Sequence, residues 1–269
     1  MKSNLANIFR IQKFLQEIKY PDYHRISREI SEYLKKKRHI SESNIFERLF
    51  KQEPWEYISG YVQFCGIQFK VTKDTLIPRI ETEQMVYQSV DLIKKKKIKN
   101  IIDVGTGSGC IAISIASLLK DISPYSIYAT DISRKVLKIA QINEENILKK
   151  KHIKWVKNDL ICDITPLKGN TLIVANLPYI PTEMYTKLNK SVLDYEPRLA
   201  LDGGETGLEL YKRLFEQIKG KKISVTAIYL ETETSIIEDT HKLAKKYYPR
   251  KKISVIQDSF ERSRFILIQ

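Results

Sequence analysis

The stretch IIDVGTGSGCIAISIASLL, residues 101–119, joins an apolar run, a glycine-rich turn and a second apolar run. It is about as long as a membrane-spanning helix. Asp103 would place a charge in lipid, and three glycines within five residues would interrupt the helix. The pattern instead predicts a buried strand that ends at Val104, a tight turn and an amphipathic helix.

Outward from this stretch, predicted strands and helices alternate. Alternation implies an α/β protein with a mainly parallel sheet covered on both faces. The last two strands leave little room for a crossover helix, so we expect them to add an antiparallel element. The expected helices are 81–97, 109–120, 133–149, 207–219 and 233–247. The expected strands are those ending at 104 and those at 126–130, 153–157, 171–175, 222–230, 253–257 and 264–268, with a long loop after 175.

The N-terminal part has a different pattern. Residues 3–51 place apolar side chains at helical spacing, Pro21 interrupts the run, and Ser41 is a predicted helix start. The segment YISGYVQFCGIQFKV, residues 57–71, has the β-branched and aromatic residues and the two glycines of a hairpin. We therefore expect a small helical domain at 1–56, a bridging hairpin and loop at 57–80, and the α/β domain at 81–269.

Composition excludes several classes of protein. Of the 269 residues, 42% are apolar and 29% charged, as in folded chains rather than disordered ones. The net charge of +14 suits attraction to an acidic partner, an RNA-rich setting or only a soluble surface. The three cysteines have no paired spacing, and no histidine pair has ligand spacing, so neither disulfides nor a metal site are predicted. The N-terminus lacks the apolar run of a signal peptide, and we expect a cytoplasmic protein.

Candidate chemistry lies where the predicted strands end. The glycines of residues 105–109 let the backbone approach a ligand, and the next helix begins with free N–H groups. Asp131 ends the next strand, where a carboxylate can accept hydrogen bonds from ribose hydroxyls. The pair predicts a nucleoside-containing ligand, NAD or S-adenosylmethionine, although a glycine turn by itself fits any α/β protein.

The ends of two further strands distinguish between NAD and S-adenosylmethionine as the predicted ligand. The third strand runs into Asn158-Asp159-Leu160, a polar residue and an apolar neighbour suited to an adenine amino group and ring face. The fourth runs into Asn176-Leu177-Pro178-Tyr179, where a rigid Pro-Tyr turn presents a side-chain amide outward from the sheet. Its place in the same crevice favours a functional amide over a simple turn former.

Five segments follow one another from about Gln52 to the C-terminus: EPWEYISGYVQFCGIQFKV, LIPRIETE, DVGTGSGCIAISIA, ANLPYIP and EPRLALDGGETGLELY. In this order the chain resembles the peptide chain release factor N5-glutamine methyltransferase family. The resemblance implies a Rossmann-like class I methyltransferase sheet. It also implies methyl transfer from S-adenosylmethionine to the glutamine amide nitrogen in the Gly-Gly-Gln loop of class 1 release factors. Residues 1–50 match by helical character alone.

The resemblance also implies residue roles. Cofactor contacts would come from Asp103, Gly105, Thr106, Gly107, Ser108, Gly109, Asp131, Ile132, Asp159, Leu160 and Asn176. The glutamine would meet the catalytic residues Asn176, Leu177, Pro178 and Tyr179, with Pro78, Arg79 and Glu81 in a loop at the mouth. Residues 196–204 would form a supporting loop. Leu177 and Ile80 stand where the family usually has proline, and we expect the Leu177 carbonyl to stay in place with slightly less rigidity.

The chemistry of the motif supports these roles. An amide nitrogen is a poor nucleophile because its lone pair is delocalised into the carbonyl. Hydrogen bonds from its two N–H groups to the Asn176 side-chain oxygen and the Leu177 carbonyl would aim it at the sulfonium methyl. The same contacts would stabilise positive charge that develops on nitrogen, so no general base is required. Tyr179 would pack on the amide plane and exclude water.

Related motifs leave alternatives open. Asn-Leu-Pro-Tyr also occurs in RNA adenine N6-methyltransferases and Asn-Pro-Pro-Tyr in DNA adenine N6-methyltransferases, which orient an exocyclic nitrogen. A catalytically silent, cofactor-binding protein on the ribosome is a third hypothesis. The glycine motif begins about a hundred residues into the chain, whereas an RNA dimethylase would carry it near the start, and we expect no DNA-reading domain after it; both points favour the release factor. We expect the helical domain and hairpin to help grip that factor, and expect a monomer with no specific nucleic-acid or membrane contact.

Overall fold

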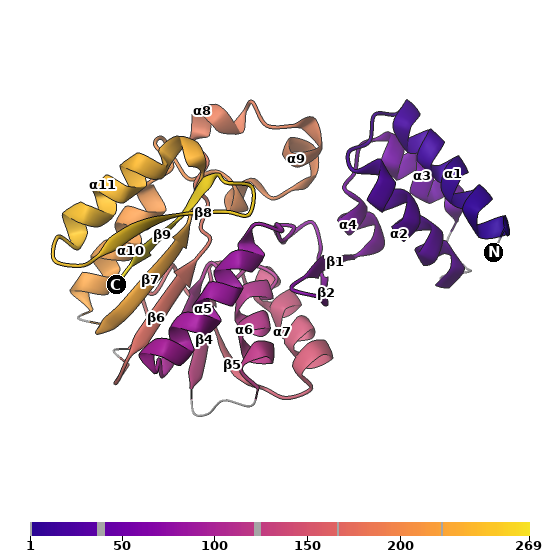
Figure 1. The fold of residues 1–269 in the computed structure, drawn as a ribbon. Helices are drawn as coiled ribbons and strands as arrows, with labels where there is room; N and C mark the ends of the chain where they lie inside the picture. Colours follow the sequence, from indigo (N-terminus) through magenta and orange to yellow (C-terminus); the bar gives the residue numbers. More distant parts are fainter. Residues whose placement is uncertain (1, 37–40, 121–124, 166, 222) are drawn as a thin grey trace. The chain divides into compact units, whose positions relative to one another are not determined.

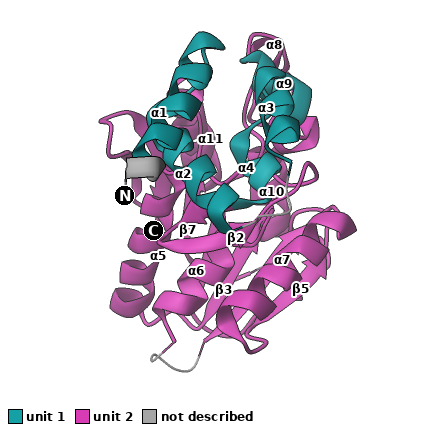
Figure 2. Ribbon diagram, turned by 90° about the vertical axis from the view of Figure 1, so that its right-hand side faces the viewer, with its two compact units in different colours: residues 1–61, 189–195 teal, residues 62–188, 196–269 magenta. Residues whose placement is uncertain are grey.

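The computed structural model describes residues 2–36, 41–120, 125–165, 167–221 and 223–269 (Figure 1). The chain divides into two compact units, coloured separately in Figure 2. Unit 1 comprises Met1–Tyr61 and Asn189–Tyr195. Unit 2 comprises Val62–Leu188 and Glu196–Gln269. Unit 1 has one buried apolar cluster and unit 2 has two among the described residues, so each unit is described separately.

Unit 1 is helical. Its apolar faces meet in a core that buries Ile11, Leu15 and Ile30 completely. The Ser41 side chain accepts a hydrogen bond from the Asn44 N–H and caps a helix, as the sequence predicted. The helices are α1 (Lys2–Glu17), α2 (Tyr23–Lys36), α3 (Glu42–Phe50), α4 (Trp55–Ser59) and α9 (Lys190–Tyr195).

The expected hairpin begins later than predicted. Tyr57 lies in the short helix α4, which Gly60 ends in a left-handed conformation with φ of 81°. Strands β1 (Tyr61–Phe64) and β2 (Ile67–Lys70) form the two-stranded sheet. The turn between them has positive φ at both of its residues, a geometry that favours two-residue hairpins. The sequence prediction was wrong at residues 57–59 because aromatic and β-branched residues also fit a buried helical turn.

The main sheet of unit 2 has seven strands in the order β5-β4-β3-β6-β7-β9-β8. Strands β5, β4, β3, β6 and β7 are parallel, and β9 runs antiparallel to both β7 and β8. The α/β fold and its antiparallel end are confirmed. Lys222, the predicted start of one strand, lies outside the described residues. The strands are β3 (Asn100–Val104), β4 (Ser126–Asp131), β5 (Ile153–Lys157), β6 (Thr171–Ala175), β7 (Val225–Glu231), β8 (Ile253–Gln257) and β9 (Ser263–Ile268).

Helices cover both faces of this sheet (Figure 1). Successive strand side chains point to opposite faces. Ile101 therefore joins the apolar cluster that includes α5 and α6, whereas Ile102 joins the cluster that includes α10 and α11. The helices are α5 (Thr82–Lys96), α6 (Cys110–Leu118), α7 (Arg134–Leu148), α10 (Glu209–Gly220) and α11 (Ile237–Tyr247), the last preceded by the 3-10 helix η2 (Thr234–Ile236).

Strand β3 lies at the point where the chain changes direction across the sheet. The chain passes from β3 to β4 and β5 on one side, then returns to β6 on the other. The carboxyl ends of β3 and β6 therefore border a crevice, the usual ligand site of such sheets.

The long segment after β6 contains short helices that the sequence did not predict: α8 (Thr182–Tyr185), α9 and the 3-10 helix η1 (Arg198–Ala200). These helices have four, six and three residues, too few to show a helical period. Among the described residues, none of the helices combines the length and the apolar character needed to cross a membrane.

Candidate active site

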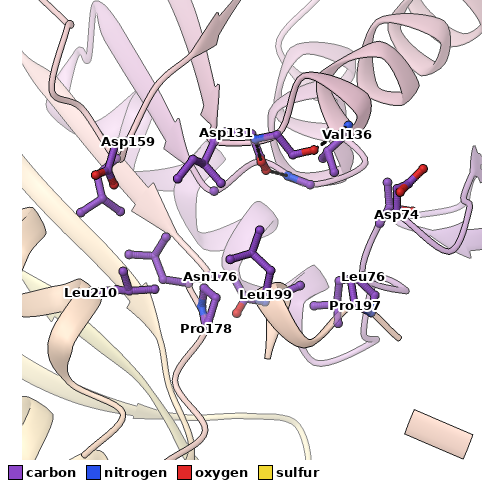
Figure 3. A pocket seen from close by; sticks show the side chains of 18 of the residues that line it. Asp74, Leu76, Asp131, Val136, Asp159, Asn176, Pro178, Pro197, Leu199 and Leu210 are labelled. Atoms are coloured by element: carbon purple, nitrogen blue, oxygen red, sulfur yellow. Dashed lines mark hydrogen bonds between the residues drawn. The ribbon is translucent and has the colours of Figure 1, made fainter. Parts of the chain in front are cut away.

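A cavity of about 360 Å³ opens at the carboxyl ends of the parallel strands (Figure 3). Its volume falls in the range of about 300–1,000 Å³ common for small-molecule sites. In the view of Figure 3, Asp131 and Asp159 lie along one rim and Asn176 and Pro178 along the opposite one. The predicted site residues that line it are Gly105, Gly107, Asp131, Ile132, Asp159, Leu160, Asn176, Leu177 and Pro178.

Other predicted residues lie behind or beside the lining. Asp103 is buried in β3 beneath the glycine loop, and Thr106, Ser108 and Gly109 are buried within the loop itself. The remaining four, Pro78, Arg79, Glu81 and Tyr179, are partly exposed and do not line the cavity. Sequence analysis missed Lys73–Leu76, Ser133, Val136, Pro197, Leu199, Ala200, Leu210 and Arg213, all of which line it. Leu76, Pro197, Leu199, Ala200 and Leu210 lie in segments quoted for the family resemblance, but no residue pattern marked them as lining a ligand site.

The glycines after β3 have distinct roles. A Cβ on Gly105 would approach the Leu177 side chain to 2.8 Å, and one on Gly109 would approach Trp155 to 2.9 Å. A Cβ on Gly107 would meet nothing within 4 Å. Gly105 and Gly109 therefore permit close packing within the protein, whereas Gly107 borders open space in the cavity. All three have positive φ, which favours glycine.

Asp103 anchors this loop from below. One carboxylate oxygen accepts hydrogen bonds from the Thr106 hydroxyl at 2.6 Å and the Ala112 N–H at 3.2 Å. Its other oxygen, Oδ1, is buried without a partner among the described residues. Burial outweighs the two hydrogen bonds and raises the pKa of Asp103 to about 7. The site thus holds a buried acceptor that the protein leaves unused.

Asp131 is fixed by backbone groups on two sides. Its Oδ2 accepts from the Gly107 N–H at 3.1 Å and its Oδ1 from the Ser133 N–H at 2.9 Å. Burial raises the pKa of Asp131, and these N–H groups oppose the rise. Each oxygen keeps a further lone pair, so a rigidly held acceptor faces the cavity.

The loop after β5 forms the next part of the wall. The Asp159 carboxylate pairs with Arg213 of α10, an ion pair with both side chains nearly half exposed. Gln217 donates from its side-chain amide to the Asp159 carbonyl and accepts from the Ile161 N–H. Leu160 between them has φ of 57°, a conformation that non-glycine residues seldom adopt, and it lines the cavity. Contacts from α10 therefore fix the shape of this loop, whereas the sequence indicated only that the loop follows β5.

The acceptor motif after β6 depends on α5 and α10. The Asn176 amide Nδ2 donates to the Thr82 hydroxyl at 3.2 Å, which leaves Oδ1 for another donor. The buried Tyr211 hydroxyl shares its single hydrogen between the Leu177 carbonyl, at 3.5 Å, and the nearer backbone carbonyl of Glu231. Tyr179 packs against the apolar cluster on this face of the sheet, and burial raises the pKa of its hydroxyl.

Two loops close the cavity opposite the sheet. Arg79 pairs with the nearly buried Glu196 carboxylate at 2.6 Å, and the Ile77 N–H donates to the same carboxylate at 3.4 Å. The two segments tied by these contacts supply Leu76 and Pro197 to the lining. Glu196 thereby holds the mouth loop in place. Among the described residues no group of three or more His, Cys, Asp and Glu side chains could hold a metal ion, and His39 lies outside them.

Comparison with known proteins places this fold and site in a methyltransferase context. The family model described as ribosomal protein L11 methyltransferase (PrmA) matches residues 80–195. The human Mettl16 catalytic domain in complex with the MAT2A 3′UTR hairpin 6 superposes with a TM-score of 0.59 at 17% identity, covering 76% of this chain and 74% of that one. The human methyltransferase 10 domain containing protein superposes with a TM-score of 0.51 at 20% identity, covering 76% and 89%. At such identities the likeness concerns the fold.

Sequence relatives are more specific. The release factor glutamine methyltransferase of Lactococcus lactis is 32% identical over 227 residues, which cover 84% of this chain and 81% of that protein. The protein of the same name from Bacteroides thetaiotaomicron is 35% identical over 228 residues, covering 83% and 78%. With this identity over most of both chains, and with the glycine loop, Asp131 and residues Asn176, Leu177 and Pro178 around one cavity, the chain belongs to the release factor glutamine methyltransferase family.

Proposed function

We propose that this protein transfers a methyl group from S-adenosylmethionine to the side-chain amide nitrogen of the Gly-Gly-Gln glutamine in class 1 peptide chain release factors. The names of its relatives support the substrate. One observation of the site carries the chemistry. Asn176, Leu177 and Pro178 line the same cavity as Asp131 and Asp159, so an acceptor amide and a nucleoside would meet there.

The cavity walls suit the cofactor. S-adenosylmethionine supplies an electrophilic methyl group on a sulfonium. The open space at Gly107 leaves room for its backbone-facing part, and Asp131 would accept hydrogen bonds from the ribose hydroxyls. Leu160 and Asp159 would flank the adenine. Asn158 lines the cavity, and its Nδ2 is buried without a partner among the described residues, which is the kind of atom that a polar ligand satisfies.

The acceptor side orients the nucleophile. Because Asn176 donates its Nδ2 to Thr82, its Oδ1 remains to accept one N–H of the glutamine amide. The Leu177 carbonyl would accept the other, since a carbonyl oxygen has two lone pairs and the Tyr211 hydroxyl, shared with the Glu231 carbonyl, occupies at most one. Two acceptors fix the amide plane and offset positive charge on its nitrogen. Leu177 also fills the space beside Gly105, a contact that couples the two halves of the site.

The remaining roles belong to the same proposal. Unit 1 and the β1–β2 hairpin would grip the release factor, and the net charge of +14 would speed its approach to an acidic partner. We propose a cytoplasmic monomer without specific nucleic-acid or membrane contact. The relatives favour this function over the adenine methyltransferase and silent-protein alternatives. The hairpin RNA named for the Mettl16 structure belongs to that protein.

One labelling experiment tests the proposal. The protein is incubated with methyl-labelled S-adenosylmethionine and, in separate reactions, a class 1 release factor, its Gly-Gly-Gln loop variant with Gln→Ala, ribosomal RNA and DNA. We expect label on the unmodified factor alone. Label on the Gln→Ala factor would refute the site of methylation, and label on RNA or DNA would support the adenine alternative.

A further inference from the structure

Glu231 is a buried carboxyl group without a role in the chemistry described so far. It is the last residue of β7 and is fully buried. Neither of its carboxylate oxygens has a hydrogen-bond partner among the described residues. Burial of an unpaired carboxylate is costly, so a carboxyl group retained in this position requires an explanation.

Its place in the sheet puts Glu231 beside the acceptor motif. Ala175 of β6 pairs with Leu230 of β7 in the parallel ladder. Asn176 and Glu231 each follow directly after this pair, at the carboxyl ends of neighbouring strands, and Glu231 still pairs with Phe265 of β9. Thr82, the first residue of α5, is buried and accepts the Asn176 Nδ2 hydrogen bond at 3.2 Å. The Thr82 hydroxyl also lowers the pKa of Glu231, although the two side chains do not meet hydrogen-bonding geometry in this structure.

We propose that Glu231 is a positioning residue that sets the orientation of the Asn176 carboxamide through the Thr82 hydroxyl. The inference rests on the proposed function, because it concerns the oxygen that would receive the glutamine amide. It assigns Glu231 no contact with substrate or cofactor.

The ionised form of Glu231 specifies one direction of hydrogen bonding. A carboxylate has no proton to give, so the Thr82 hydroxyl turns its hydrogen toward Glu231 after a small side-chain adjustment. The hydroxyl oxygen then offers only lone pairs to Asn176, which must respond with Nδ2. Oδ1 of Asn176 consequently faces the side where the glutamine amide needs an acceptor.

Protonation of Glu231 removes this constraint. The carboxyl O–H can donate to the Thr82 oxygen, and the Thr82 hydrogen becomes free for Asn176. The carboxamide can then turn over, with Oδ1 toward Thr82 and Nδ2 toward the substrate. Two amide NH₂ groups would face each other in that arrangement, and the glutamine nitrogen would lose its orientation.

The surroundings place this switch near neutral pH. Burial raises the pKa of Glu231 to about 7, and Glu81 raises it further, whereas Thr82, Arg264 and Arg79 lower it. The groups that face Glu231 come from several elements. They are Arg264 on β9, Arg79 and Glu81 before α5, Tyr179 after β6, Tyr211 on α10 and Tyr229 on β7.

The test compares kcat of the wild type and Glu231→Gln from pH 6 to pH 9, with S-adenosylmethionine and release factor saturating. We expect the wild-type kcat to rise with pH through about 7. The side-chain amide of the variant donates to Thr82 as a protonated glutamate does. We therefore expect a flat profile and, at pH 8, a kcat lower on the order of tenfold, with a much smaller change in KM for the factor. Glu238→Gln, which neutralises an exposed carboxylate on α11, should keep the wild-type profile.

Two further variants isolate the relay. Thr82→Val removes the hydroxyl at nearly constant volume and should lower kcat and flatten the profile, whereas Thr82→Ser should restore most of both. These two Thr82 variants test the relay from Glu231 to Asn176 even if Glu231→Gln folds poorly. Asp103 also has a pKa of about 7, so its protonation could alter cofactor binding over the same pH range. That effect would be present in Glu231→Gln as well as in the wild type, and saturating S-adenosylmethionine would remove it.

The outcomes separate the two proposals. A wild-type protein that never methylates the release factor would overturn the proposed function and, with it, this inference. A wild-type protein that methylates the factor, together with a Glu231→Gln or Thr82→Val variant that keeps both the kcat and the rising limb, would overturn the role of Glu231 alone.

Discussion

The two halves of the cavity are built differently. On the cofactor side, Asp103 and Asp131 bond to groups that lie close in sequence, at separations of 2 to 24 residues, and most of these partners are backbone N–H groups. On the acceptor side, Asn176 bonds to Thr82 across 94 residues, and the carboxyl group of Glu231 has no partner among the described residues. One half is a local loop motif, and the other is a long-range assembly.

The difference has a physical consequence. Backbone donors fixed by a strand-to-helix turn hold a carboxylate in one arrangement, which suits a ligand bound identically in every cycle. A chain of side-chain hydroxyl, amide and carboxyl groups has two directions of hydrogen bonding, so its state responds to protonation. The acceptor side is therefore where pH and remote substitutions should affect the rate.

Loss of the acceptor amide should have the largest effect. We expect Asn176→Ala to lower methyl transfer by a factor on the order of 10²–10³, as does removal of one group that stabilises charge in a transition state. Cofactor affinity measured by calorimetry should change little, because the wall around Asp131 remains. Turnover equal to wild type would remove Asn176 from the mechanism.

Glu231→Gln should stabilise the protein above neutral pH. The carboxyl pKa is 4.5 in the unfolded chain and about 7 in the folded one, so the folded state holds the proton more tightly. Stability therefore falls as pH rises from 4.5 to 7 and stays low above it. Urea unfolding at pH 8 should show the variant more stable by up to about 3 kcal/mol. The difference should vanish near pH 4; a pH-independent difference would contradict the raised pKa.

Asp131→Ala should weaken cofactor binding and leave the acceptor side of the cavity unchanged. Loss of hydrogen bonds to a charged group costs about 1.5–3 kcal/mol, so the Kd for S-adenosylmethionine should rise by one to two orders of magnitude. At saturating cofactor the kcat and its pH profile should remain near those of the wild type. An unchanged Kd in calorimetry would rule out the ribose assignment.

Arg213→Ala should have the smallest effect. Its ion pair with Asp159 is nearly half exposed on both sides. Such pairs contribute about 0–1 kcal/mol to stability. Thermal unfolding should show a loss within this range, and added salt should reduce the difference from wild type further. A loss well beyond it would mean that α10 holds the loop after β5 more firmly than exposure indicates.

Sequence patterns predicted most of the fold because those patterns are local. The apolar run of β3 and the glycines after it specify a strand and a turn within ten residues of each other. The period of α7 and its Ser133 cap are equally local, and the cap's hydrogen bond to the Val136 N–H is present. Short helices such as α4 and α8 were missed because five or four residues show no period.

The residues of the site likewise fall into those marked by local sequence patterns and those brought together by the tertiary structure. The sequence by itself determined the strand ends and the residues that follow them, which made Asp131, Asp159 and Asn176 candidates. Only the tertiary structure decided that Thr82, Tyr211 and Glu231 surround the acceptor motif. Strand order and helix packing bring together segments far apart in the chain, and no local preference of any one segment records which side chains it will meet.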